Sequence, residues 1–205
     1  MTRREEILRA TLDLAAERGL GAVTLSQIAE RVGMRKPSLY NHFASKDELV
    51  QAAYQLLRDQ ARERASATAV DAAELAEGSL EEVLLRSFDR YGSFVLDEEM
   101  LRFFRVLYAE RSTSPVAAQV MVDETNRMIG QVKALFYALV AHGRLRGDDV
   151  DMVALSYAMT VHGLVDLQLD RLTAGTAVAP SEEDVFSEVK AYIIWFAGQM
   201  EVRHA

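Results

Sequence analysis

Residues 24–49, "TLSQIAERVGMRKPSLYNHFASKDEL", decide the fold of the first part of the chain. Thr24 is followed three residues later by Gln27, the spacing of a capping box, in which each side chain bonds the other residue's free backbone N–H. An apolar stripe follows at helical spacing, and Gly33 ends this segment after about nine residues. A turn then leads to a second short helix over residues 35–42, in which Pro37 is tolerated because it lies in the first turn. The stretch therefore predicts a helix, a glycine turn and a helix.

Helices are also predicted on both sides of this stretch. Residues 3–18 carry apolar or small groups at helical spacing and stop at "RGLG". Ser45 and Glu48 repeat the capping-box spacing and start a long helix over residues 46–65. Helices this short are unstable alone, so the first three must pack on one another, with Leu39 and Phe43 turned inward.

The rest of the chain also has helical periodicity. Residues 66–79 are small and polar and predict a loop. Five further helices are expected over residues 80–95, 98–110, 115–141, 149–172 and 182–202. The predicted fold is therefore all-α with about nine helices. It divides into a helix-turn-helix head at residues 1–50 and a larger helical ligand and dimerisation domain at residues 51–205.

Composition limits the functions that the chain can have. The sequence has 205 residues and no cysteine, which excludes disulfides, thiolate catalysis and cysteine-bound metals. We expect a cytoplasmic protein without a spanning helix or leader peptide. The net charge is −8, but residues 1–50 carry eight Lys/Arg against seven Asp/Glu, and the remainder carries fifteen against twenty-four. This asymmetry suggests that the first fifty residues have a separate task.

With Leu39 buried, the outer face of the second short helix carries groups suited to the major groove of double-stranded DNA. Lys and Arg donate to guanine, Asn pairs with adenine, and a proline ring can contact a thymine methyl. The expected base-reading residues are Arg35, Lys36, Pro37, Ser38 and Asn41. Helix N-termini and neighbouring donors hold phosphates, which makes Thr24, Tyr40, His42 and Lys46 the expected phosphate contacts.

These residues resemble the TetR family of transcriptional regulators. The stretch "ILRATLDLAAERGLGAVTLSQIAERVGMRKPSLYNHFASKDELV" carries the family's A-x-x-L-A-x-x-x-G, T-x-x-x-I-A-x-x-x-G and S-L-Y-x-H-F-x-S-K-x-E-L pattern. Arg35 stands where the family often has a small polar residue. The segment "SYAMTVHGLVDL" resembles the W-H-G sequence of one C-terminal subgroup, with Val161 in place of Trp. The resemblance implies a repressor that a small, largely apolar effector releases from a pseudo-palindromic operator.

The last helix carries two apolar faces, which predicts two packing partners. One stripe includes Val189, Ile193 and Phe196, whereas Ile194 and Trp195 lie off it. The second face is expected to form a homodimer interface, because a monomer rarely exposes such a patch. Two helices from each of two subunits would then make a four-helix bundle.

Aromatic and methionine residues of the middle helices could line an effector pocket or form ordinary core. The pocket candidates, with His162 added from the W-H-G resemblance, are Phe103, Phe104, Tyr108, Met121, Met128, Phe136, Tyr137 and His162.

Two other classes of function remain as alternatives. A bundle enzyme with a carboxylate metal site would need two Glu-x-x-His motifs, and only Glu201 to His204 matches. We therefore expect no catalysis, no metal and no cofactor. A helical protein-binding module would not need the basic turn followed by Tyr, Asn and His.

Overall fold

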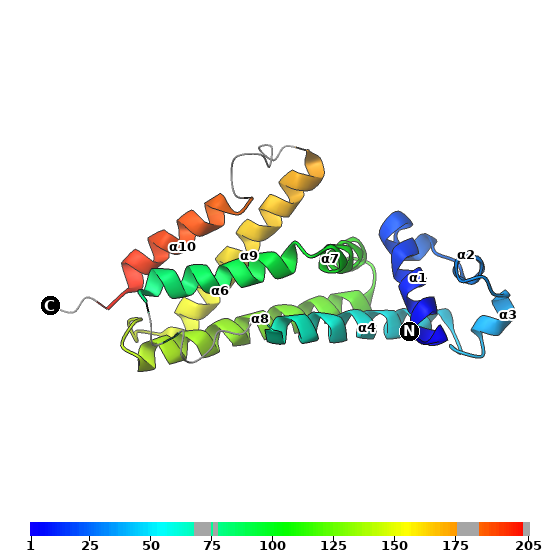
Figure 1. The fold of residues 1–205 in the computed structure, drawn as a ribbon, viewed down its shortest axis with the longest axis horizontal. Coiled ribbons are helices and arrows are strands. Elements are labelled where there is room, and N and C mark those ends of the chain that lie inside the picture. Colours follow the sequence, from blue (N-terminus) through cyan, green and yellow to red (C-terminus); the bar gives the residue numbers. More distant parts are fainter. Residues whose placement is uncertain (68–74, 76–77, 176–184, 203–205) are drawn as a thin grey trace. The chain divides into compact units, whose positions relative to one another are not determined.

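The structure is a computed structural model that describes residues 1–67, 75, 78–175 and 185–202. The described residues form nine α-helices and one 3₁₀ helix (Figure 1), which confirms the all-α prediction. The elements are α1 Arg3–Arg18, η1 Leu20–Ala22, α2 Leu25–Arg31, α3 Lys36–Leu39, α4 Lys46–Ala67, α6 Leu80–Val95, α7 Glu98–Glu110, α8 Pro115–Ala141, α9 Val150–Ala174 and α10 Ser187–Met200.

The chain packs as two compact units. Unit 1 consists of Met1–Ala67 and Phe94–Glu124, and unit 2 of Thr68–Ser93 and Thr125–Ala205. Helix α4 therefore packs in the same unit as the head. The functional division into residues 1–50 and 51–205 stays a prediction.

Local capping fixes where the head helices begin. The predicted capping box of α2 is present, because Gln27 N donates to Thr24 Oγ1 at 3.3 Å and Thr24 N donates to Gln27 Oε1 at 2.9 Å. A second box, Thr2 with Glu5, starts α1. The box expected at α4 is only half formed. Glu48 N donates to Ser45 Oγ at 3.0 Å, but the Glu48 carboxylate accepts from Ala44 N instead of Ser45 N.

The second helix of the turn motif is shorter than the sequence predicts. Helix α3 ends at Leu39, and residues 40–42 continue as a hydrogen-bonded turn. The reason is a change of hydrogen-bond register. Asn41 N donates to Ser38 O at 3.3 Å and His42 N donates to Leu39 O at 2.9 Å, so these bonds span three residues instead of four.

Unit 1 has a continuous apolar core. Helix α1 packs against α2, α4 and α7 (Figure 1). The core includes Leu39 and Phe43, as predicted, together with side chains from α1, α4 and α7. Its most completely buried members include Ile7, Ile28, Leu49, Met100 and Leu107.

Unit 2 is held by an aromatic cluster and by its C-terminal end. Phe136, Tyr157 and Phe196 lie with ring centroids 4.8–5.8 Å apart, and α10 packs on α9. The Glu201 carboxylate accepts a hydrogen bond from Leu80 N at 3.1 Å, so it caps the start of α6.

Helix α10 starts later than the sequence predicts, because it was expected from residue 182. It begins at Ser187, Val185 and Phe186 form a turn before it, and residues 182–184 lie outside the described residues.

The turn at Gly33 gives a direct test of the head's geometry. Its φ of +65° lies in the left-handed region, and nothing within 4 Å would meet an added Cβ. We expect Gly33→Ala to lower the free energy of unfolding by about 1 kcal/mol through backbone strain alone, measured by urea denaturation. Gly21→Ala is the control, because Gly21 has equal space and no positive φ. Equal urea midpoints for the two variants would contradict the strain argument.

Candidate nucleic-acid interface

The expected base-reading residues lie together on and around a single helical turn. Arg35, Lys36, Pro37 and Asn41 are exposed, and Ser38 is half-buried. Leu39 is 1% exposed and Phe43 is 3% exposed, so both sit in the core beneath this turn. The buried pair fixes the backbone, and the neighbouring groups consequently face solvent. We call Arg35, Lys36, Pro37, Ser38 and Asn41 the reading face.

The side chains of the expected phosphate contacts differ in exposure and in whether they already form hydrogen bonds within the protein. The Tyr40 ring is 51% exposed, whereas His42 is half-buried. Thr24 is exposed, but its hydroxyl already serves the capping box. Lys46 is half-buried, and its Nζ donates to the carbonyl of Leu20 at 3.4 Å, which holds the ammonium group near η1.

Two arginines of α1 support the reading face, and the sequence analysis did not identify them. One Arg3 guanidinium nitrogen donates to Val32 O at 2.6 Å, and Arg4 donates to His42 O at 2.5 Å. The Arg4 guanidinium also lies 4.1 Å from the centroid of the Phe43 ring. Cations next to the last carbonyls of a helix are favourable. The capping-box pattern "TRRE" was a signal for the start of α1, but not for these long-range contacts.

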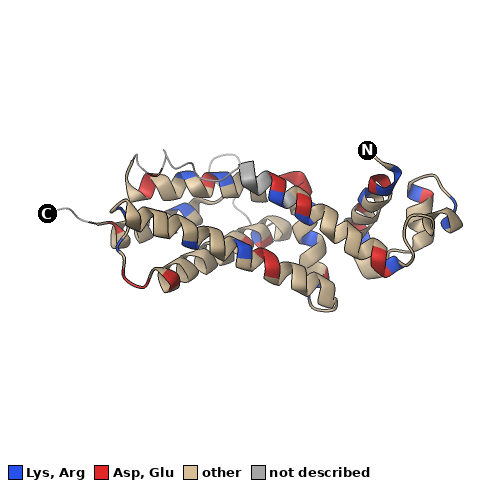
Figure 2. Cartoon of the chain, turned by 90° about the horizontal axis from the view of Figure 1, so that it is seen from below, with Lys and Arg blue, Asp and Glu red and all other residues tan. Residues whose placement is uncertain are grey.

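Ion pairing separates the cations of the head into two groups. Arg3, Arg4, Arg9, Arg18 and Arg31 each lie within 4.0 Å of a carboxylate. The other three, Arg35, Lys36 and Lys46, have no carboxylate partner among the described residues, and the Lys46 ammonium instead donates to the carbonyl of Leu20. Charges of both signs are distributed over the helices of each unit (Figure 2). The positive charge available to a polyanion is therefore concentrated at the start of α3.

The expected pocket residues do not form one cluster within either unit. Phe103, Phe104, Tyr108 and Met121 belong to unit 1, where Phe103 is core and Phe104 and Met121 pack against it. Met128, Phe136, Tyr137 and His162 belong to unit 2. Phe136 is fully buried, but Tyr137 is 53% exposed, and its hydroxyl donates to Asp151 at 3.3 Å.

A small, half-buried polar group lies around His162 in unit 2. His162 Nε2 is 3.7 Å from Asp166 Oδ2, one helical turn further along α9. The other ring nitrogen, Nδ1, is buried without a hydrogen-bond partner among the described residues. Burial, with a smaller contribution from the Asp166 carboxylate, raises the pKa of Tyr91 on α6. We call Tyr91, His162 and Asp166 the polar group of unit 2.

The predicted dimer residues are exposed on α10. Ile194 is 45% and Trp195 is 60% exposed. On α9, three further large apolar side chains are exposed, namely Met152, Met159 and Leu167.

By length and composition α9 is long and apolar enough to cross a membrane, but core helices of soluble proteins meet the same criterion. In the part of the chain that the structure describes, no three His, Asp or Glu side chains form a group able to hold a metal ion.

Comparison with known proteins covers both parts of the chain. Residues 7–53 match the model of the bacterial regulatory proteins of the tetR family. Residues 82–198, more than half of the chain, match the C-terminal domain of AefR-like transcriptional repressors.

Individual relatives agree with these matches. A probable HTH-type transcriptional regulator, ArpR from Pseudomonas putida, is 25% identical over 194 residues, which cover 93% of this chain and 87% of the relative. The transcriptional repressor KstR2 of Mycobacterium tuberculosis is 49% identical over 49 residues, 24% of each chain. A TetR-family regulator from Pseudomonas syringae pv. tomato has the same fold, with a TM-score of 0.73, 23% identity and 98% of both chains covered. The chain therefore belongs to the TetR family of bacterial transcriptional regulators.

Proposed function

We propose that this ligand-responsive regulator is a cytoplasmic homodimeric repressor that reads a pseudo-palindromic operator with the reading face on and around α3. The main support for this proposal is that Arg35 and Lys36 have no carboxylate partner among the described residues, although the chain has a net charge of −8. Cations that are not neutralised within the protein are available to guanine edges and phosphates. Tyr40 at the end of α3 and Lys46 at the start of α4 are the proposed phosphate donors.

The apolar faces of α9 and α10 support the proposed dimer. Only 28% of the most apolar 18-residue window of α9 is buried within the chain, and Trp195 on α10 is 60% exposed. Burying such side chains against a second copy is favourable by roughly 25 cal/mol per Å² of apolar surface. A four-helix bundle of two α9 and two α10 helices would place this surface out of water, and its two-fold axis matches a pseudo-palindrome.

The polar group of unit 2 supports an effector site near α6 and α9. A buried histidine nitrogen without a partner can accept a hydrogen bond from a ligand hydroxyl or amine. The aromatic side chains of unit 2 suit an otherwise apolar ligand. An effector that favours the conformer with weak operator affinity lowers DNA binding, and DNA then lowers effector binding by the same factor.

Operator binding can be tested at the reading face. We expect the wild-type protein to select a pseudo-palindromic duplex from a random library, with an affinity that falls steeply as salt is added. Lys36→Ala and Asn41→Ala should each weaken binding about 10- to 100-fold, because each change removes a base contact. Arg18→Ala is the control, since it removes an exposed cation from the same unit. Unchanged affinity in both reading-face variants, measured by fluorescence anisotropy, would contradict the assignment of the face.

The dimer can be tested at α10. A charge at Trp195 would be buried in the proposed interface without a partner, so Trp195→Glu should give a monomer. The same substitution at Val122, which is 52% exposed on α8, should leave the dimer intact. Sedimentation velocity measures both masses. A dimer in the Trp195→Glu variant would place the interface elsewhere.

The effector site can be tested without knowing the ligand in advance. A compound library is screened for release of the wild-type protein from the selected operator. We expect Asp166→Asn to weaken the response to the hits by about tenfold or more, because it removes the carboxylate charge that lies 3.7 Å from His162 Nε2. Operator affinity without a compound should not change. Asp170→Asn, an exposed carboxylate one turn further along α9, is the control. Equal responses in both variants would exclude a role for the polar group.

A further inference from the structure

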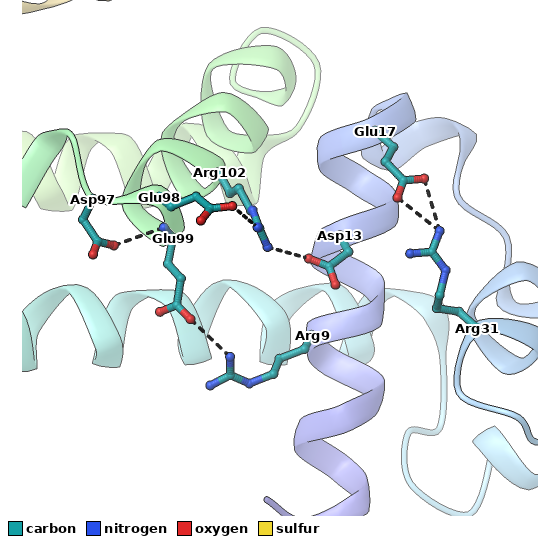
Figure 3. Close-up of polar contacts among 8 residues, drawn as sticks. All are labelled: Arg9, Asp13, Glu17, Arg31, Asp97, Glu98, Glu99 and Arg102. Carbon is teal, nitrogen blue, oxygen red and sulfur yellow. Dashed lines mark hydrogen bonds and ion pairs between the residues drawn. The ribbon is translucent and has the colours of Figure 1, made fainter.

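Helix α7 is joined to the head by two ion pairs that lie outside the reading face. Arg9 of α1 is 3.3 Å from a carboxylate oxygen of Glu99, and Asp13 of α1 is 3.2 Å from a guanidinium nitrogen of Arg102 (Figure 3). A third contact follows at the other end of α7, where Leu20 N of η1 donates to Glu110 at 2.9 Å. We call the two ion pairs the α1–α7 seam.

The signs of the charges alternate across the seam. On α1 a cation, Arg9, precedes an anion, Asp13, by four residues, and on α7 an anion, Glu99, precedes a cation, Arg102, by three. These spacings put each pair on one face of its helix. A shift of about one helical turn in one direction would bring Arg9 toward Arg102, and a shift in the other direction would bring Asp13 toward Glu99, so like charges would meet in either case. The pattern favours one register and disfavours the alternative.

Neighbouring contacts fix the side chains of α7 in place. Asp97 caps the helix, because its carboxylate accepts from Glu99 N at 3.1 Å (Figure 3) and also from Met100 N at 3.2 Å. Arg102 also bonds Glu98 on its own helix, so its guanidinium bridges Glu98 and Asp13. Glu99 and Arg102 thus hold defined positions on the face of α7 that meets α1.

The apolar contacts beneath the seam do not select a register in the same way. Met100, Phe103 and Leu107 of α7 share one buried cluster with Ile7 and Leu14 of α1. Apolar contacts supply most of the free energy of packing, but they are non-directional and tolerate small displacements. The exposed ion pairs add little to overall stability. Their effect is therefore on the orientation of α1 rather than on whether the unit folds.

We propose that Arg9, Asp13, Glu99 and Arg102 are positioning residues for operator binding. They set the orientation of α1 against α7, and Arg3 and Arg4 of α1 in turn hold the backbone on either side of the reading face, at the Val32 and His42 carbonyls. This inference rests on the proposed dimeric repressor, because two heads with a fixed orientation match one half-site spacing. Loss of the seam consequently relaxes the spacing requirement and leaves recognition of a single half-site unchanged.

The test uses a substitution that conserves net charge and leaves the head's own residues intact. The double variant Glu99→Gln with Arg102→Gln removes both ion pairs from the α7 side. The control variant is Glu17→Gln with Arg31→Gln. This pair joins α1 to α2 at 3.1 Å within the head and has similar exposure, 41–46% against 37–47% for the seam (Figure 3). Both full-length proteins are first compared with the wild type by thermal unfolding.

Affinities are measured for the duplex that the wild type selects, for duplexes with half-sites moved by one or two base pairs, and for a single half-site. We expect the seam variant to lose about three- to tenfold affinity at the native spacing and to show a smaller penalty for altered spacing. Its half-site affinity should equal that of the wild type. The charge-swapped double variant Arg9→Glu with Glu99→Arg restores an ion pair of opposite sign, so it should keep most of the spacing preference that the seam variant loses. The control variant should keep the full spacing preference.

A seam variant with the spacing profile of the wild type would overturn the inference. So would a loss of half-site affinity equal to the loss at the full operator, because that result indicates damage to the reading face itself. If the wild type selected no duplex at all, the proposed function would fail instead, and the two failures are thereby distinguished.

Discussion

The burial of Leu39 and Phe43 is the constraint on which the rest of the head depends. Helix α3 has four residues, Lys36–Leu39, and a helix of one turn has no stability of its own. Burying each of these two side chains contributes roughly 2 kcal/mol, which offsets the conformational entropy of the turn. Arg4 strengthens the anchor by lying over the Phe43 ring. Because the anchor is rigid, the charged groups around it have a defined direction without any contacts of their own.

The local parts of this arrangement were predictable from the sequence, and the long-range parts were not. The box of Thr24 with Gln27 depends on residues three apart, and the inward direction of Leu39 follows from helical periodicity. The early end of α3 depends on a change from four-residue to three-residue hydrogen bonds, which residue type does not reveal. The contact of Arg3 with Val32 joins residues 29 positions apart, and that of Arg9 with Glu99 joins residues 90 apart. Charged residues at helix surfaces give no sign of such partners.

The candidate effector residues show a second limit of prediction from sequence, which concerns apolar side chains. An aromatic or methionine in a helical stripe has the same pattern whether it fills a core or lines a cavity. Phe103 and Phe136 are both core residues, in different units, and Tyr137 is exposed. The more informative residues in unit 2 are polar, because His162 has a buried ring nitrogen without a hydrogen-bond partner among the described residues and lies 3.7 Å from Asp166. Glu201, which the sequence offered only as part of a metal motif, has a structural task at the start of α6.

The concentration of available positive charge at Arg35 and Lys36 has a consequence for how such a protein would search a chromosome. Residues 51–205 carry a surplus of nine negative charges, which disfavours contact of that part of the chain with DNA. Weak binding to arbitrary sequence shortens each unproductive encounter and leaves fewer molecules occupied at competing sites. A small number of copies per cell would then suffice to keep a single operator occupied.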